Sequence, residues 1–75
     1  MDLKAEIRRY VLDHVSAAET ADGVMRVWLK LTPGQQPLSD IERTLEELVS
    51  DGFLERHHLP GGATIYRRAQ HSARN

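Results

Sequence analysis

The chain contains no cysteine among its 75 residues, which excludes a disulfide framework and a thiolate metal site. A small cysteine-free domain fits a reducing compartment, so we expect a cytoplasmic location. No stretch approaches the roughly 18 consecutive apolar residues that cross a membrane, and residues 1–15 lack the apolar segment of a signal peptide. The formal net charge is only −1, so the chain as a whole attracts neither nucleic acid nor anionic lipid strongly.

Catalytic and metal-binding motifs are also missing. The sequence has no G-x-S-x-G, H-E-x-x-H, glycine-rich phosphate loop or EF-hand loop. His57 and His58 are adjacent, so on a strand they would point to opposite faces, and no zinc-type ligand spacing is present. A domain of this size leaves little room for a substrate pocket of about 300 Å³ or more. We therefore expect a protein that is not an enzyme and that uses no cofactor or metal.

The length limits the chain to one small domain, which buries roughly 60% of the surface that its unfolded form exposes. A single core of this size stabilises a fold by about 3–5 kcal/mol. We expect this domain to span residues 1–68, and residues 69–75, which lack periodicity, to form a disordered tail. The charge is uneven: residues 37–52 sum to −4 and residues 53–75 to +3, while residues 1–36 balance. An acidic segment is thus followed by a basic one.

Apolar residues recur at helical spacing in the first half of the chain. The first helix is predicted over residues 2–15, capped by Asp2, with an apolar stripe of Leu3, Ile7, Tyr10, Val11, His14 and Val15. The second is predicted over residues 21–31, capped by Thr20 or Asp22. It carries one stripe of Val24, Val27, Trp28 and Leu31 and another of Met25 and Leu29. A helix apolar on most sides is either buried on two sides or meets a partner.

The third helix is predicted to begin at Ser39, which forms an S-x-x-E capping box with Glu42. Its core face is Ile41, Leu45, Leu48 and Val49. Gly52 fits the left-handed position just after the helix, and Phe53 can fold back on the last turn. Residues 53–58 and 63–68 then read as two strands joined by the turn residues 59–62. We expect Leu54 and Ile65 to face inward and Tyr66 to be half-buried.

The order and spacing I41-x3-L45-x2-L48-x3-G52-F53-L54-x-R56, followed by a glycine-rich turn and a tyrosine-bearing strand, resemble the winged helix-turn-helix superfamily. The resemblance covers residues 2–68 and implies an α+β fold, a three-helix core with a C-terminal two-stranded β-hairpin wing. It also implies DNA binding of the transcription-regulator kind, with the third helix in the major groove and the wing on phosphates or in the minor groove.

The basic hairpin makes wing-led DNA binding the first hypothesis for function, because cations that neutralise phosphates supply most non-specific DNA affinity. The third helix would contribute little, since its groove-facing positions hold four carboxylates and one arginine. The candidate DNA-binding residues are Arg56, His57, Arg67, Arg68, Arg43 and Arg74.

The alternative is a protein–protein interaction module without DNA binding. It would dock through the apolar second helix or the acidic third helix, because tryptophan and methionine are enriched at interface cores. The candidate residues are Met25, Trp28, Leu29, Glu46 and Glu47. No extra dimerisation helix is evident, so we expect a monomer or weak homodimer, with DNA or a protein as partner and no membrane.

Overall fold

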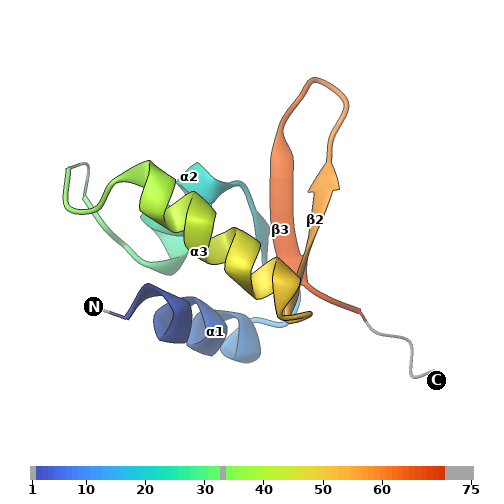
Figure 1. The fold of residues 1–75 in the computed structure, drawn as a ribbon, viewed down its shortest axis with the longest axis horizontal. Helices are drawn as coiled ribbons and strands as arrows, with labels where there is room; N and C mark the ends of the chain where they lie inside the picture. The colour runs from blue at the N-terminus through green and yellow to red at the C-terminus, as the bar shows by residue number, and fades with distance from the viewer. Residues whose placement is uncertain (1, 33, 71–75) are drawn as a thin grey trace.

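The computed structural model describes residues 2–32 and 34–70. It is a mixed α+β domain, as predicted, and its arrangement is compatible with a winged-helix-like fold (Figure 1). The elements in chain order are α1 (Leu3–Asp13), β1 (Ala18–Glu19), α2 (Ala21–Gly23), the π-helix η1 (Val24–Trp28), α3 (Leu38–Ser50), β2 (Leu54–His58) and β3 (Thr64–Arg68). The β2–β3 hairpin projects beyond the helices (Figure 1).

The three helical segments close over one apolar core. Ile7 and Val11 of α1 meet Ile41, Leu45 and Leu48 of α3, and all five side chains are fully buried. The second helix adds Val24, Met25 and Trp28, and the sheet adds Leu54 and Tyr66. Because fully burying one such side chain is worth about 1.5–3 kcal/mol, this cluster is the main stabilising feature of the domain.

The first helix is shorter than predicted. Asp2 caps it as expected, since its carboxylate accepts a hydrogen bond from the Ala5 N–H at 3.1 Å. The helix ends at Asp13, however, and the His14 backbone N–H bonds to the carbonyls of Tyr10 and Val11. Val15 therefore lies beyond the helix and is exposed rather than part of the core stripe.

The predicted second helix consists of α2 followed directly by η1, so it departs from α-helical winding after its first turn. Thr20 caps it, accepting from the Gly23 N–H at 3.1 Å. The Val24 N–H still bonds four residues back, to the Thr20 carbonyl at 2.8 Å, whereas in η1 the bonds span five residues, as from the Leu29 N–H to the Val24 carbonyl at 2.9 Å. This wider winding turns each residue through a smaller angle. Val27, predicted to lie in the core stripe, is therefore rotated to the surface and is 48% exposed.

The second helix also stops earlier than the predicted residue 31. Lys30 adopts a positive φ of 53°, which is unfavourable for a residue with a Cβ. This left-handed conformation at Lys30 reverses the direction of the chain. The Leu31 N–H then bonds to the Met25 carbonyl at 2.9 Å, and the Leu31 side chain turns back into the core.

The predicted capping box at the start of α3 is not formed. The helix begins one residue earlier, at Leu38, with Pro37 at the cap position and no side-chain capping bond. Ser39 is therefore already inside the helix, where its hydroxyl cannot reach a cap donor.

The end of α3 matches the prediction. Gly52 has a φ of 81°, its N–H bonds to the Val49 carbonyl, and the Phe53 N–H bonds to the Leu48 carbonyl, both at 3.0 Å. This is a Schellman motif, and it turns the chain directly into the hairpin.

The sheet has three antiparallel strands in the order β1-β3-β2, so the prediction of a two-stranded hairpin was incomplete. β1 comes from the connection after α1, where no strand was predicted. It pairs Ala18 with Arg67 and Glu19 with Tyr66. The last strand in the sequence is therefore the central strand of the sheet.

The register of the hairpin corrects the predicted inward face. Leu54 lies opposite Arg68, and Arg56 lies opposite Tyr66. Since side chains alternate along a strand, Leu54 and Tyr66 share the core-facing side, while Ile65 points to the other side. Tyr66 is buried rather than half-buried, and Ile65 is only partly covered.

Candidate functional site

The outer face of the hairpin holds a cluster of charged side chains centred on Glu55. One of its carboxylate oxygens lies 2.6 Å from Nε2 of His57 and 3.0 Å from Nε of Arg67. The other oxygen accepts from the Gln70 backbone N–H at 3.1 Å. These hydrogen bonds, His57 first, then Gln70 and Arg67, lower the pKa of Glu55 to about 2. Two predicted DNA-binding residues, His57 and Arg67, thus share one carboxylate.

The inner face of the hairpin is tied to α3 through Glu46. One carboxylate oxygen of Glu46 accepts from the Tyr66 hydroxyl at 2.8 Å, and the other pairs with the Arg56 guanidinium. Burial, with the Glu46 hydrogen bond as the second cause, raises the pKa of Tyr66 to about 12. Glu46 and Arg56, predicted for different partners, therefore bind each other and hold the hairpin against the helix.

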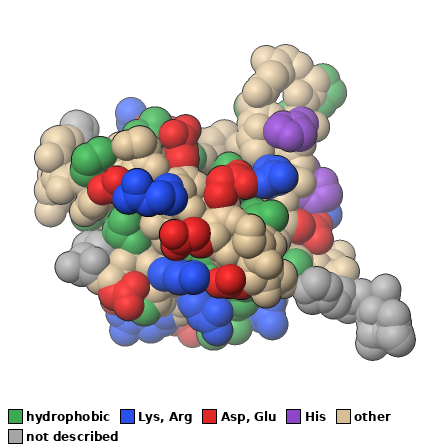
Figure 2. Space-filling view, in the orientation of Figure 1, with side chains coloured by type: hydrophobic (Ala, Val, Ile, Leu, Met, Phe, Trp, Pro, Cys, Tyr) green, Lys and Arg blue, Asp and Glu red, His purple; other side chains and the backbone are tan. Residues whose placement is uncertain are grey.

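The solvent-facing surface of α3 retains unpaired negative charge. Arg43, the only cation on this helix, pairs with Asp40 at 2.8 Å. Glu42 and Glu47 are exposed and make no ion pair or side-chain hydrogen bond within the described residues. Figure 2 shows carboxylates and cations interleaved over this side of the molecule, with histidines on the hairpin.

A groove of about 360 Å³ separates the N-terminal half of α3 from the hairpin. Its apolar part includes Leu38, which is 39% exposed, and its charged part includes Glu42. Asp22 also lines the groove but is paired with Arg26 at 3.0 Å. The lining residues are Thr20, Ala21, Asp22, Leu38, Glu42, Ala63, Thr64 and Tyr66. The groove thus combines a small apolar surface with one unpaired carboxylate.

The predicted contact residues of the second helix lie mostly in the core. Met25 is 8% exposed and Trp28 is 6% exposed, and the Trp28 ring stacks on Tyr10 at 5.3 Å. Leu29 is partly buried and packs against the same cluster. In this fold Met25 and Trp28 are buried and belong to the core cluster.

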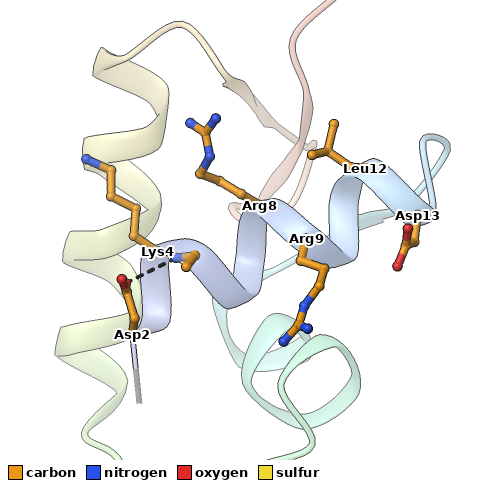
Figure 3. A pocket seen from close by; sticks show the side chains of 7 residues that line it. Asp2, Lys4, Arg8, Arg9, Leu12 and Asp13 are labelled. Atoms are coloured by element: carbon orange, nitrogen blue, oxygen red, sulfur yellow. Dashed lines mark hydrogen bonds between the residues drawn. The ribbon is translucent and has the colours of Figure 1, made fainter.

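A second surface was not foreseen from the sequence. It joins Arg8 of α1, Phe53 at the α3–β2 junction and Arg68 at the end of β3. The guanidinium carbons of Arg8 and Arg68 lie 4.7 and 5.5 Å from the centroid of the Phe53 ring. In the sequence, the feature that could have indicated this surface is the pair Lys4 and Arg8, which lie four residues apart on one side of α1 (Figure 3). Arg68 was predicted as a DNA-binding residue. Arg74, also predicted as a DNA-binding residue, lies outside the described residues.

Comparison with known proteins adds no assignment. No protein-family model matches the chain, and no curated protein is detectably similar to it in sequence. Within residues 2–32 and 34–70, no three metal-ligating side chains converge on one point. Over the same residues, no helix is both long and apolar enough to cross a bilayer.

Proposed function

We propose that this domain is a non-catalytic binding module and that the groove between α3 and the hairpin takes a basic segment of a protein partner. The observation that carries the proposal is the Glu42 carboxylate, which is exposed at the groove and has no cationic partner within the described part of the chain. The partly exposed Leu38 lines the same groove.

A lysine or arginine side chain of the partner fits this lining. Long basic side chains bury their methylene stems along apolar surface while the charged head stays at a polar group. Here Leu38, Ala21 and Ala63 would contact the stem, and Glu42 would accept hydrogen bonds from the head. Asp22 contributes less, because Arg26 already occupies its carboxylate.

The same geometry makes wing-led DNA binding the weaker proposal. Arg56 is paired with Glu46 of the domain itself. Arg67 and His57 both contact Glu55. To bind a phosphate, each arginine would have to leave its carboxylate, which would then repel the phosphate. Glu42 and Glu47 would add to that repulsion on α3, since duplex affinity depends on net neutralisation of phosphates.

Binding to short labelled peptides, followed by fluorescence anisotropy at low salt, tests the proposal. A peptide with lysine, arginine and leucine should bind more tightly than the same peptide with glutamine at its basic positions. Glu42→Gln should weaken that binding by about two- to fivefold, the range of one exposed ion pair. Glu47→Gln is the matched control, because Glu47 is an exposed glutamate of α3 outside the groove.

A mixed-sequence DNA duplex serves as the competing ligand. If the duplex binds more tightly than the basic peptide, and Arg67→Gln reduces its salt dependence, then wing-led DNA binding is the correct function and the peptide proposal fails. Equal loss of peptide binding in Glu42→Gln and Glu47→Gln would also contradict the groove, because it would indicate general attraction to an acidic surface.

A further inference from the structure

We propose that Arg8, Phe53 and Arg68 form a second binding site, which takes a carboxylate on an acidic, partly apolar protein segment. This site shares no residue with the groove and has the opposite charge preference. It lies where α1, the α3–β2 junction and the end of β3 come together.

Arg8 and Arg68 differ from the other described arginines because neither forms an ion pair with a described carboxylate of the domain. Of the seven arginines within residues 2–32 and 34–70, five bind a carboxylate of the domain itself, namely Arg9, Arg26, Arg43, Arg56 and Arg67. Arg8 and Arg68 have no carboxylate partner in that part of the chain. Both instead lie over the same phenyl ring. The fold thus leaves two guanidinium groups together and uncompensated.

The ring prepares both guanidinium groups for an anion. A guanidinium stacked on an aromatic ring keeps its planar fork of N–H donors directed sideways, where a carboxylate can bind in bidentate fashion. The backbone of Phe53 is held on both sides, because its N–H bonds to the Leu48 carbonyl in the Schellman motif and its carbonyl accepts from the Ala69 N–H at 3.0 Å. Both guanidinium groups are therefore held at the same ring, and neither is paired with a carboxylate within the described residues.

Two apolar side chains lie beside Arg8 on α1. The solvent side of α1 forms a shallow hollow of about 490 Å³, in which Ala5 and Leu12 are the apolar lining and Asp2, Lys4, Arg8, Arg9 and Asp13 are the charged lining. Leu12 is 51% exposed, and Figure 3 shows Arg8 and Leu12 extending from neighbouring turns on the same side of the helix. A segment with an acidic residue next to an apolar one would contact Arg8 through its carboxylate and Leu12 through its apolar side chain.

The surroundings favour a compact carboxylate over nucleic acid. Lys4, one turn before Arg8 on α1, is paired with Asp51 at 2.8 Å, and its hydrogen bond to Asp51, with a smaller contribution from Glu47, raises the pKa of Lys4. A phosphate backbone continuing past Arg8 would meet these carboxylates.

The test measures anisotropy of a labelled peptide in which glutamates flank a leucine, at low salt, with the intact chain. The double variant Arg8→Gln with Arg68→Gln should weaken binding by about tenfold or more, because two charge-assisted contacts are lost. Arg9→Gln is the matched control, since Arg9 is the next residue of α1 and already pairs with Glu6 at 2.7 Å. It should change the affinity by less than about twofold. Phe53→Leu keeps both charges and removes the ring, so it should weaken binding by an intermediate factor.

Circular dichroism confirms that each variant is folded before binding is compared. The proposal is wrong if the acidic peptide does not bind, if Arg9→Gln weakens it as much as the double variant, or if a single-stranded oligothymidine binds more tightly. Glu42→Gln separates the two sites: it should impair binding of the basic peptide in the groove and leave binding of the acidic peptide unaffected, so each proposal can fail without the other.

Discussion

Truncation of Leu45 to alanine tests the shared core on which every other feature depends. Leu45 is fully buried at the centre of α3. The change removes the side-chain atoms Cγ, Cδ1 and Cδ2, and each buried carbon contributes about 0.8 kcal/mol of transfer free energy. The cavity left behind adds to this loss. We expect a destabilisation of about 3 kcal/mol, which is most of the roughly 3–5 kcal/mol available to a domain of this size.

Urea denaturation measures this loss through Trp28, the only tryptophan of the chain, which is buried against Tyr10 and so reports on the core. With a denaturant slope of about 1 kcal/mol/M for a small domain, the midpoint should fall by about 3 M, leaving the variant barely folded. Leu12→Ala is the control: it makes the same chemical change in α1 at a side chain that is 51% exposed. The control should lose less than about 1 kcal/mol. A loss below about 1 kcal/mol in Leu45→Ala, with an unchanged slope, would refute the arrangement of the three helices around a common interior.

Four further changes have defined outcomes. Gly52→Ala places a Cβ at a φ of 81° and should cost about 1–2 kcal/mol in urea unfolding, so an unchanged midpoint would argue against the left-handed turn. Lys30→Gly relieves a φ of 53° and should stabilise the domain by up to about 1 kcal/mol in the same assay, whereas a loss would contradict that conformation. Tyr66→Phe removes the hydroxyl that donates to Glu46 and should cost about 1 kcal/mol; no loss would mean that this bond contributes nothing. Glu55 has a pKa near 2 in the folded state against an ordinary value of 4.5, so its contribution is complete above that value and disappears as the pH falls toward 2. The melting temperature of Glu55→Gln should therefore lie below that of the natural chain near neutral pH and approach it at about pH 2, and a constant difference would exclude this linkage.

The parts of the fold that were predicted correctly are those encoded by neighbouring residues. Asp2, Thr20 and Gly52 each act at a helix end through a bond spanning only a few residues. Residue type and position identified Asp2 and Gly52 and narrowed the second cap to Thr20 or Asp22. The hairpin was found in the same way, within one residue of its observed strands.

The parts that were missed depend on residues far apart in the chain. β1 is two residues of modest strand preference, and it exists because β3 pairs with it more than 40 positions later. The inward face of the hairpin was misassigned because residues 54–58 and 64–68 do not alternate cleanly, so only packing against α3 decides it.

The electrostatics of the candidate sites were missed for the same reason. Arg56 and Arg67 were identified as basic residues of a wing, but their partners Glu46 and Glu55 lie 10 and 12 residues away. The meeting of Arg8 with Phe53 spans most of the domain. Composition therefore revealed the charges of this chain but not which of them remain available to a ligand.

The central place of β3 in the sheet has a consequence for synthesis on the ribosome. β1 is complete once Glu19 has been added, yet its partner residues, Tyr66 and Arg67, are among the last of the described chain to be made. At about 5–20 residues per second, the first strand waits for roughly 2–10 seconds without a neighbour. During that interval the sheet cannot close, because β1 and β2 both pair with β3, which is made after them.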